Sequence, residues 1–353
     1  MKIFSLTILS ALSVFILSCS KKNNFYGAGD EKFAYMGRID FSEKQKPKMW
    51  ATATQVSFAF KGTSCSAIII DEQLYGTYHN YLNIIVDGVN KRIKLKAKTD
   101  TIMVADNLPD GIHTVVICKS TEAGIGYIQF EGVFCETLLP HPPLPKRKIE
   151  SYGDSITSAM ASDTTGIGCG KGEWYDQTNG YFSYAAITAR NLNAQYQLTS
   201  ASGIGLIHSC CNMDILMPQV YDKISLRDNK LEWNFKNYKP DVVTICLGQN
   251  DGVQDSTAFC SAYVKFINTL RNHYPAASFI LLSSPMADST LLAAQRKYLG
   301  GVKSFIEAAG DKNIFTYFFS RQSIAGCGYH PTISEHEQIA GELTAYIKKV
   351  KNW

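Results

Sequence analysis

The sequence has little of what several common protein classes require. The formal net charge is only +4 in 353 residues, and no basic stripe of the kind needed for nucleic-acid binding is present. The 10 cysteines include no C-x-x-C pair, which argues against a zinc knuckle or a thioredoxin-like redox site. We therefore expect no nucleic-acid partner, no metal ion and no cofactor. Hydrophobic residues make up 45% of the chain, which suffices for a sizeable core and, at this length, about two domains.

The first 19 residues have the pattern of an export signal. Met1 and Lys2 begin it, and the apolar run over 3–17 is short for a membrane span. Ser18 and Cys19 resemble the end of a bacterial lipobox, in which the cysteine is lipidated and becomes the mature N-terminus. We expect export, a lipid anchor on Cys19 as the only membrane contact, on the periplasmic or cell-surface face, and a linker over 20–32. The alternative is an ordinary secretory signal with an incidental cysteine.

Cysteine usage beyond the signal leaves the disulfides open. Without Cys19, nine of the 10 cysteines remain, so at least one thiol is free or pairs between chains. Cys118 and Cys246 lie in apolar runs, where cysteine usually behaves as a small hydrophobe. Disulfides are compatible with an export compartment, but the spacing does not determine their connectivity.

Residues 33–140 predict an all-β domain. The run over 81–86 leads into Asp87-Gly88, a strong hairpin signal, and 91–96 alternates polar and apolar residues on the other side of that turn. The spacing of the short strands favours a β-sandwich or jelly roll. Further strands are predicted over 55–60, 66–70, 101–104, 113–117, 127–130 and 132–134.

The pattern changes after a proline-rich connector over 141–147, which we take as the domain boundary. From 148 to 353, strands alternate with helices, which predicts a parallel sheet with helices on both faces. Strands are predicted over 149–152, 194–199, 242–247, 279–283 and 314–317, and helices over 182–193, 214–222, 256–273, 291–309 and 334–349.

Polar or glycine-rich segments follow the strands of this second domain, where active sites of parallel sheets lie. Ser155 comes directly after the first strand, at the start of a helix whose backbone N–H groups suit a developing oxyanion. Gly203, the segment 248–251 and His330 follow later strands. Each alone has a structural explanation as a turn or helix cap, but together they supply a hydroxyl, an imidazole and amide donors.

These blocks resemble the SGNH, or GDSL-like, hydrolases. Gly153-Asp154-Ser155 is similar to their first block, Gly203 to the second, 248–251 to the third and His330-Pro331 to the last. The N-terminal half is similar to that of carbohydrate esterase family 2, which joins a jelly roll to an SGNH domain. This second resemblance implies removal of acetyl groups from polysaccharides or oligosaccharides such as xylan. It is carried by Met36-Gly37-Arg38, 60–64, 86–88, 108–115 and 119–123.

The resemblance also implies a mechanism. Ser155 is the expected nucleophile and His330 the expected general base. The oxyanion hole would consist of the Ser155 and Gly203 backbone N–H groups and the Asn250 side-chain amide. Glycine suits position 203 because the backbone must approach the reacting carbon closely.

One position departs from the family pattern. Gly328 stands where relatives commonly place an aspartate that orients the histidine. We expect a Ser–His dyad in which a backbone carbonyl holds His330; the alternatives are an acid from elsewhere in the fold or loss of activity. We expect structural roles for Asp154, in the turn after the first strand, and for His336, on the helix that a capping box at Thr332–Glu335 begins.

Three aromatic residues lie near these blocks. Trp174, Tyr175 and Tyr329 are candidates for stacking on sugar rings, although Trp174 and Tyr175 have the equal alternative of packing their loop onto its own domain. Two other functions remain open. One is a lipase or thioesterase on the same scaffold, although the sequence has no long apolar loop to shelter an acyl chain. The other is a glycan-binding protein with a degenerate site.

Overall fold

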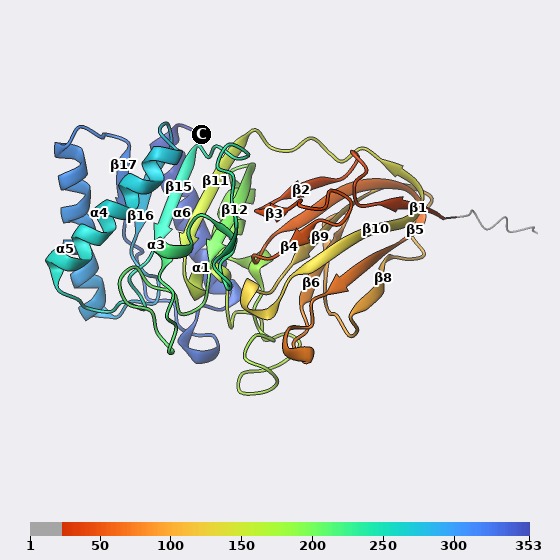
Figure 1. Cartoon of the computed structure of the whole chain (residues 1–353), viewed down its shortest axis with the longest axis horizontal. Coiled ribbons are helices and arrows are strands. Elements are labelled where there is room, and N and C mark those ends of the chain that lie inside the picture. The colour runs from red at the N-terminus through yellow and green to blue at the C-terminus, as the bar shows by residue number, and fades with distance from the viewer. Residues whose placement is uncertain (1–22) are drawn as a thin grey trace, which may run out of the picture.

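The computed structural model describes residues 23–353, which form two domains placed side by side (Figure 1). The predicted signal segment and Cys19 lie outside these residues. Among the helices of residues 23–353, none combines the length and apolar character that crossing a bilayer requires.

The N-terminal domain is built from antiparallel strands, which confirms the all-β prediction. Its central order is β3-β4-β10-β5-β9-β6-β7, with β1 paired to β10 and with β2 and β8 paired to β5. The finer expectation of a jelly roll stays a prediction. The strands are β1 (Asn24–Gly27), β2 (Ala34–Met36), β3 (Ile39–Asp40), β4 (Lys48–Met49), β5 (Gln55–Asp71), β6 (Tyr81–Val86), β7 (Val89–Lys94), β8 (Thr99–Ala105), β9 (Gly111–Lys119) and β10 (Ile128–Leu139), with short 3-10 turns η1 (Leu74–Gly76) and η2 (Ala123–Ile125).

Three boundaries in this domain differ from the prediction. The runs over 55–60 and 66–70 form one 17-residue strand, β5, and those over 127–130 and 132–134 form one strand, β10. Register shifts in the β5–β10 ladder, between Phe130 and Gly132 and between Cys135 and Thr137, interrupt the alternation without ending the strand. Within the predicted linker over 20–32, β1 pairs with β10, so folded structure begins before residue 33.

The C-terminal domain contains the predicted parallel sheet with helices. Five strands are ordered β12-β11-β15-β16-β17, and all neighbours pair in parallel. The strands are β11 (Arg147–Gly153), β12 (Ala194–Ser200), β15 (Val242–Cys246), β16 (Ser278–Leu282) and β17 (Ile314–Tyr317), with a separate hairpin of β13 (Lys223–Ser225) and β14 (Lys230–Glu232). The helices are α1 (Ser155–Ser158), α2 (Tyr184–Asn191), α3 (Met217–Val220), α4 (Ser256–His273), α5 (Ser289–Ala308) and α6 (Ile333–Lys351), with 3-10 turns η3 (Gly180–Phe182) and η4 (Cys327–Tyr329).

The helix predicted over 214–222 is reduced to the single turn α3. Pro218 lies in its first turn, where a missing N–H is tolerated, and Leu216 before it is extended. The chain then enters β13, so the helix has no room to continue. By contrast, α4 has the predicted bounds, because Asp255 caps its first turn by accepting from the Ala258 N–H at 2.8 Å.

Successive side chains of β15 are buried on opposite faces of the sheet. Val243 and Ile245 join the apolar cluster that contains residues of α4 and α5, such as Phe259 and Val302. Val242 belongs to the cluster that contains residues of α2 and α6. Every residue of β15 is buried, which is typical of a parallel sheet that helices cover on both sides, as Figure 1 shows.

Buried polar contacts join the two domains. Arg38, next to β2, is 2% exposed and bonds the Glu150 carboxylate on β11 at 2.7 Å. The Tyr196 hydroxyl on β12 donates to Gln55 at 2.8 Å. The loop after α1 packs on the N-terminal domain, where the Tyr81 hydroxyl donates to Asp176 at 2.8 Å. The N-terminal domain is thereby held against the strand and the loop that flank Ser155.

Candidate active site

Ser155 lies at the point where β11 ends and α1 begins. Asp154 caps α1, because its carboxylate accepts the Ile156 N–H at 3.0 Å, and this confirms its predicted structural role. The Ser155 side chain is near the surface of a cavity but only 5% of the residue is exposed. As the first residue of a helix, Ser155 has a backbone N–H without an intrahelical acceptor, available to a ligand.

His330 completes a hydrogen-bonded dyad with this serine. Its Nε2 lies 2.9 Å from Ser155 Oγ, and its Nδ1 lies 3.0 Å from the Gly328 carbonyl oxygen. A carbonyl can only accept, so Nδ1 carries the proton and Nε2 accepts from the serine hydroxyl. Burial lowers the pKa of His330, which keeps the imidazole neutral and able to take a proton.

Gly328 replaces the usual acid through its backbone. Its left-handed conformation (φ 56°, ψ 35°) is accessible to glycine without strain and turns its carbonyl toward the imidazole. The expectation that a backbone carbonyl holds His330 is therefore confirmed. A carbonyl orients the ring and selects the tautomer, but it supplies less negative charge to an imidazolium than a carboxylate would.

Gly203 and Asn250 bring the expected donors to the same cavity. Gly203 follows β12 with φ 86°, and within residues 23–353 its N–H makes no hydrogen bond, so the donor is free. The Asn250 Nδ2 donates to the Ile204 carbonyl at 2.8 Å and lies 3.5 Å from the Asp154 carboxylate. Gly203 and Asn250 line the same cavity as Ser155 and His330. The arrangement can hold an oxyanion beside an activated hydroxyl.

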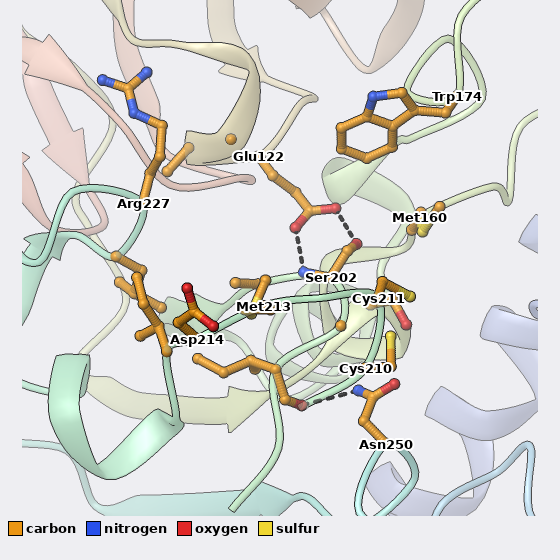
Figure 2. A pocket seen from close by; sticks show the side chains of 18 of the residues that line it. Glu122, Met160, Trp174, Ser202, Cys210, Cys211, Met213, Asp214, Arg227 and Asn250 are labelled. Carbon is orange, nitrogen blue, oxygen red and sulfur yellow. Dashed lines mark hydrogen bonds between the residues drawn. The ribbon is translucent and has the colours of Figure 1, made fainter. Parts of the chain in front are cut away.

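The cavity has a volume of about 730 Å³ and is formed by both domains. The N-terminal domain supplies Glu122, Ala123 and Gly124, and Figure 2 shows Glu122 pointing at Ser202 from above the site. Much of the remaining wall of the cavity is apolar. Its side chains are Met160, Ile204, Met213, Ile215 and Leu226.

Nearby acids and His336 serve the framework. Asp251 accepts from the backbone N–H groups of Leu206, Ile207 and His208 and so fixes the loop after Gly203. Burial, with Asp251 nearby, raises the pKa of Asp154 to about 7. His336 is fully buried on α6, as predicted, and its Nδ1 accepts the Tyr184 N–H at 3.2 Å. Within residues 23–353, no group of three or more His, Cys, Asp or Glu side chains is arranged to hold a metal.

The three aromatic candidates have different surroundings. Trp174 is 44% exposed and lines the cavity (Figure 2), and Tyr329 is 75% exposed next to His330. Tyr175 is fully buried, which corrects its assignment as a sugar platform. Its ring packs beside Tyr78 and its hydroxyl accepts the His79 N–H at 3.4 Å, so it fastens the loop to the N-terminal domain.

Sequence reasoning missed two features of the site. Cys169, in the loop after α1, forms a disulfide with Cys327, three residues before His330. The spacing of nine cysteines carries no pairing signal, although the position of Cys327 beside the histidine was visible. Glu122 was noted only within a stretch similar to the esterase family, and its approach to Ser202 depends on how the domains meet.

Comparison with known proteins finds matches for both domains. Residues 35–142 match the model for the N-terminal domain of carbohydrate esterase 2, and residues 149–343 match that for GDSL-like lipases and acylhydrolases. A solved family two carbohydrate esterase from Clostridium thermocellum, in complex with cellohexaose, is 35% identical; the match covers 91% of this chain and 99% of that one, with a TM-score of 0.84.

Curated relatives carry the names of carboxylic ester hydrolases. The cellulase/esterase CelE of Acetivibrio thermocellus is 35% identical over 332 residues, which are 90% of this chain; the chain spans 39% of that relative's length. An acetylxylan esterase/glucomannan deacetylase of Cellvibrio japonicus is 26% identical, with both chains covered in full.

Proposed function

Because the chain belongs to carbohydrate esterase family 2, we propose that it is a carbohydrate O-acetyl esterase with a Ser155–His330 acyl-enzyme mechanism. The observation that carries the proposal is the 2.9 Å contact between Ser155 Oγ and His330 Nε2. Acetylated xylan-like polysaccharides or oligosaccharides are the proposed substrates, as supported by relatives named as acetylxylan esterases and by a neighbour bound to cellohexaose.

The proposed reaction has two halves. Ser155 Oγ attacks the acetyl carbonyl carbon while His330 Nε2 takes the hydroxyl proton, and the sugar hydroxyl leaves with that proton. Water then attacks the acetyl-serine, and His330 again moves the proton, which releases acetate and regenerates the serine. In both halves the Ser155 and Gly203 N–H groups and the Asn250 amide would bind the oxyanion.

The decisive test measures acetate release from acetylated xylan and turnover of p-nitrophenyl acetate. We expect activity in the unaltered protein and a loss of about 10⁵-fold or more in kcat for Ser155→Ala, since nucleophile removal in such sites has effects of this size. Ser261→Ala, an exposed position on α4, is the matched control. No turnover in the unaltered protein, with binding of the polysaccharide retained, would instead favour a glycan-binding protein.

A second candidate, a hydrolase of longer acyl esters, is favoured by the apolar wall of the cavity. Met160, Met213 and Leu226 lie on it, although the sequence shows no long apolar loop. A series of p-nitrophenyl esters from acetate to octanoate separates the two functions. Preference for acetate supports the deacetylase, and rising kcat/KM with chain length supports a lipase or thioesterase.

We further propose export with a lipid anchor on Cys19. The apolar run over 3–17 supports this, and so does the Cys169–Cys327 disulfide, because such bonds persist in oxidising compartments. In the native host, metabolic labelling with a palmitate analogue should mark the protein, and Cys19→Ser should abolish the label. A labelled Cys19→Ser protein, or an unlabelled unaltered one, would contradict the anchor.

A further inference from the structure

A buried carboxylate crosses the domain boundary next to the candidate active site. Glu122 belongs to the N-terminal domain and is only 4% exposed. One carboxylate oxygen accepts the Ser202 backbone N–H at 2.6 Å, and the other accepts the Ser202 hydroxyl. Figure 2 shows the two bonds, which join the Glu122 carboxylate to the backbone nitrogen and the hydroxyl of Ser202. Ser202 is therefore held at two points by the other domain.

The segment that carries Glu122 is itself firmly anchored. Lys119, at the end of β9, is fully buried, and its Nζ donates to the Thr121 carbonyl at 2.6 Å and to the Glu122 carbonyl at 3.0 Å. The Glu122 carbonyl also accepts the Ile125 N–H at 3.1 Å in η2. A buried lysine amino group that donates to two backbone carbonyls of this segment leaves the glutamate little freedom to move.

The residue held by Glu122 precedes Gly203. The Gly203 N–H belongs to the peptide unit that joins it to Ser202, so the bonds that hold Ser202 limit the directions open to that N–H. On the other side, the Gly203 carbonyl accepts the Cys210 N–H at 2.8 Å. A glycine has wide conformational freedom, and bonds on either side restrict it. Gly203 lines the cavity, and within residues 23–353 its N–H has no hydrogen-bond partner.

We propose that Glu122 is a positioning residue that aims the Gly203 N–H at the reacting carbonyl, so that the N-terminal domain takes part in catalysis. This rests on the proposed esterase function. A donor held in place before reaction stabilises the transition state without cost of reorganisation, and a mobile one does so poorly. Glu122 touches no substrate atom in this account and acts only through the turn.

The test measures kcat and KM for p-nitrophenyl acetate in the full-length protein. For Glu122→Ala we expect kcat to fall about 10- to 100-fold with KM within about threefold, less than the roughly 10²–10³-fold cost of removing a donor outright. Glu122→Gln should recover most of kcat, because its carbonyl accepts from the Ser202 N–H and its amide can donate to the Ser202 hydroxyl. Gln55→Ala, which removes a different contact between the domains, should leave kcat unchanged.

Three outcomes would overturn the inference. Unaltered kcat in Glu122→Ala is one, and an equal fall in Gln55→Ala, which would indicate general loosening of the domain interface, is another. If circular dichroism shows that Glu122→Ala does not fold, Ser202→Ala replaces it, because this variant removes only the bond to the Ser202 hydroxyl. An unchanged kcat in Ser202→Ala is the third outcome that would overturn the inference. Absence of turnover in the unaltered protein would overturn the esterase proposal itself. Failure of the Glu122 inference alone would leave the unaltered protein active, so the two failures can be distinguished.

Discussion

The disulfide between Cys169 and Cys327 ties the loop that follows α1 to the loop that carries His330. The two cysteines are 158 residues apart in sequence, and Cys327 also accepts the His330 N–H through its carbonyl at 3.1 Å. In the folded protein the disulfide therefore constrains the position of the imidazole relative to Ser155. In the unfolded protein it restricts the conformations of the chain.

Replacing both cysteines with serine should lower the free energy of unfolding by about 2–4 kcal/mol, the usual range for a disulfide closing a long loop. The kcat for ester hydrolysis should fall too, because the His330 loop loses its tether. Urea unfolding and steady-state kinetics measure the two effects. Cys260→Ser, at a free cysteine on α4, is the control. Unchanged unfolding midpoints and kcat in the double variant would show that the bond is dispensable.

The pH dependence of kcat/KM should follow the neutral form of His330. Burial lowers the pKa of this imidazole below the ordinary 6.5, so protonation in the folded enzyme requires a more acidic solution. The acid limb of kcat/KM should therefore have its midpoint below pH 6.5. Asp154, with a pKa of about 7, titrates in the same region, so Asp154→Asn isolates the histidine. An acid limb with an apparent pKa above 6.5 in Asp154→Asn contradicts this assignment.

The buried Arg38–Glu150 pair should be important to stability. The Arg38 guanidinium also donates to the Tyr221 and Lys223 carbonyls, and Glu150 accepts from Tyr274. Removing one partner leaves the charge of the other buried and unpaired. Arg38→Met should therefore lower the free energy of unfolding by about 3–5 kcal/mol.

The double variant Arg38→Met/Glu150→Gln should lose less than the sum of the single changes, because neither charge is then left unpaired. Lys303→Ala, which breaks the partly exposed 2.7 Å pair with Glu307 on α5, should cost at most about 1 kcal/mol. Additive losses in urea unfolding would argue against coupling between Arg38 and Glu150.

Adjacent aromatic residues should give opposite phenotypes. Trp174→Ala should raise KM for acetylated xylan several-fold and leave p-nitrophenyl acetate hydrolysis unchanged, because the exposed indole contacts only a bulky substrate. Tyr175→Ala should instead lower the free energy of unfolding by about 3–5 kcal/mol, since its ring is fully buried. Steady-state kinetics and urea unfolding of both variants test this prediction. A larger rise in KM from Tyr175→Ala than from Trp174→Ala would contradict the assignment of Trp174 to substrate binding and Tyr175 to stability.

Local patterns in the sequence determined the elements and their order. The largely apolar run at β15 and the capped amphipathic stretch at α4 encode a buried strand and a helix through contacts between near neighbours. Since parallel strands end at a common edge, the placement of Ser155, Gly203, Asn250 and His330 around one cavity was predictable too. Even the carbonyl that replaces the missing acid was expected, because Gly328 lies two residues from the ring that it holds.

What only the tertiary structure decided depends on residues that are distant in the chain. The burial of Tyr175 against the N-terminal domain, the pairing of Cys169 with Cys327 and the reach of Glu122 to Ser202 all follow from how separate loops and two domains meet. No local period or cap encodes such contacts, because their energy comes from partners that folding alone brings together. The sequence therefore determined which groups meet at the cavity, and the assembly of the two domains decided how firmly they are held.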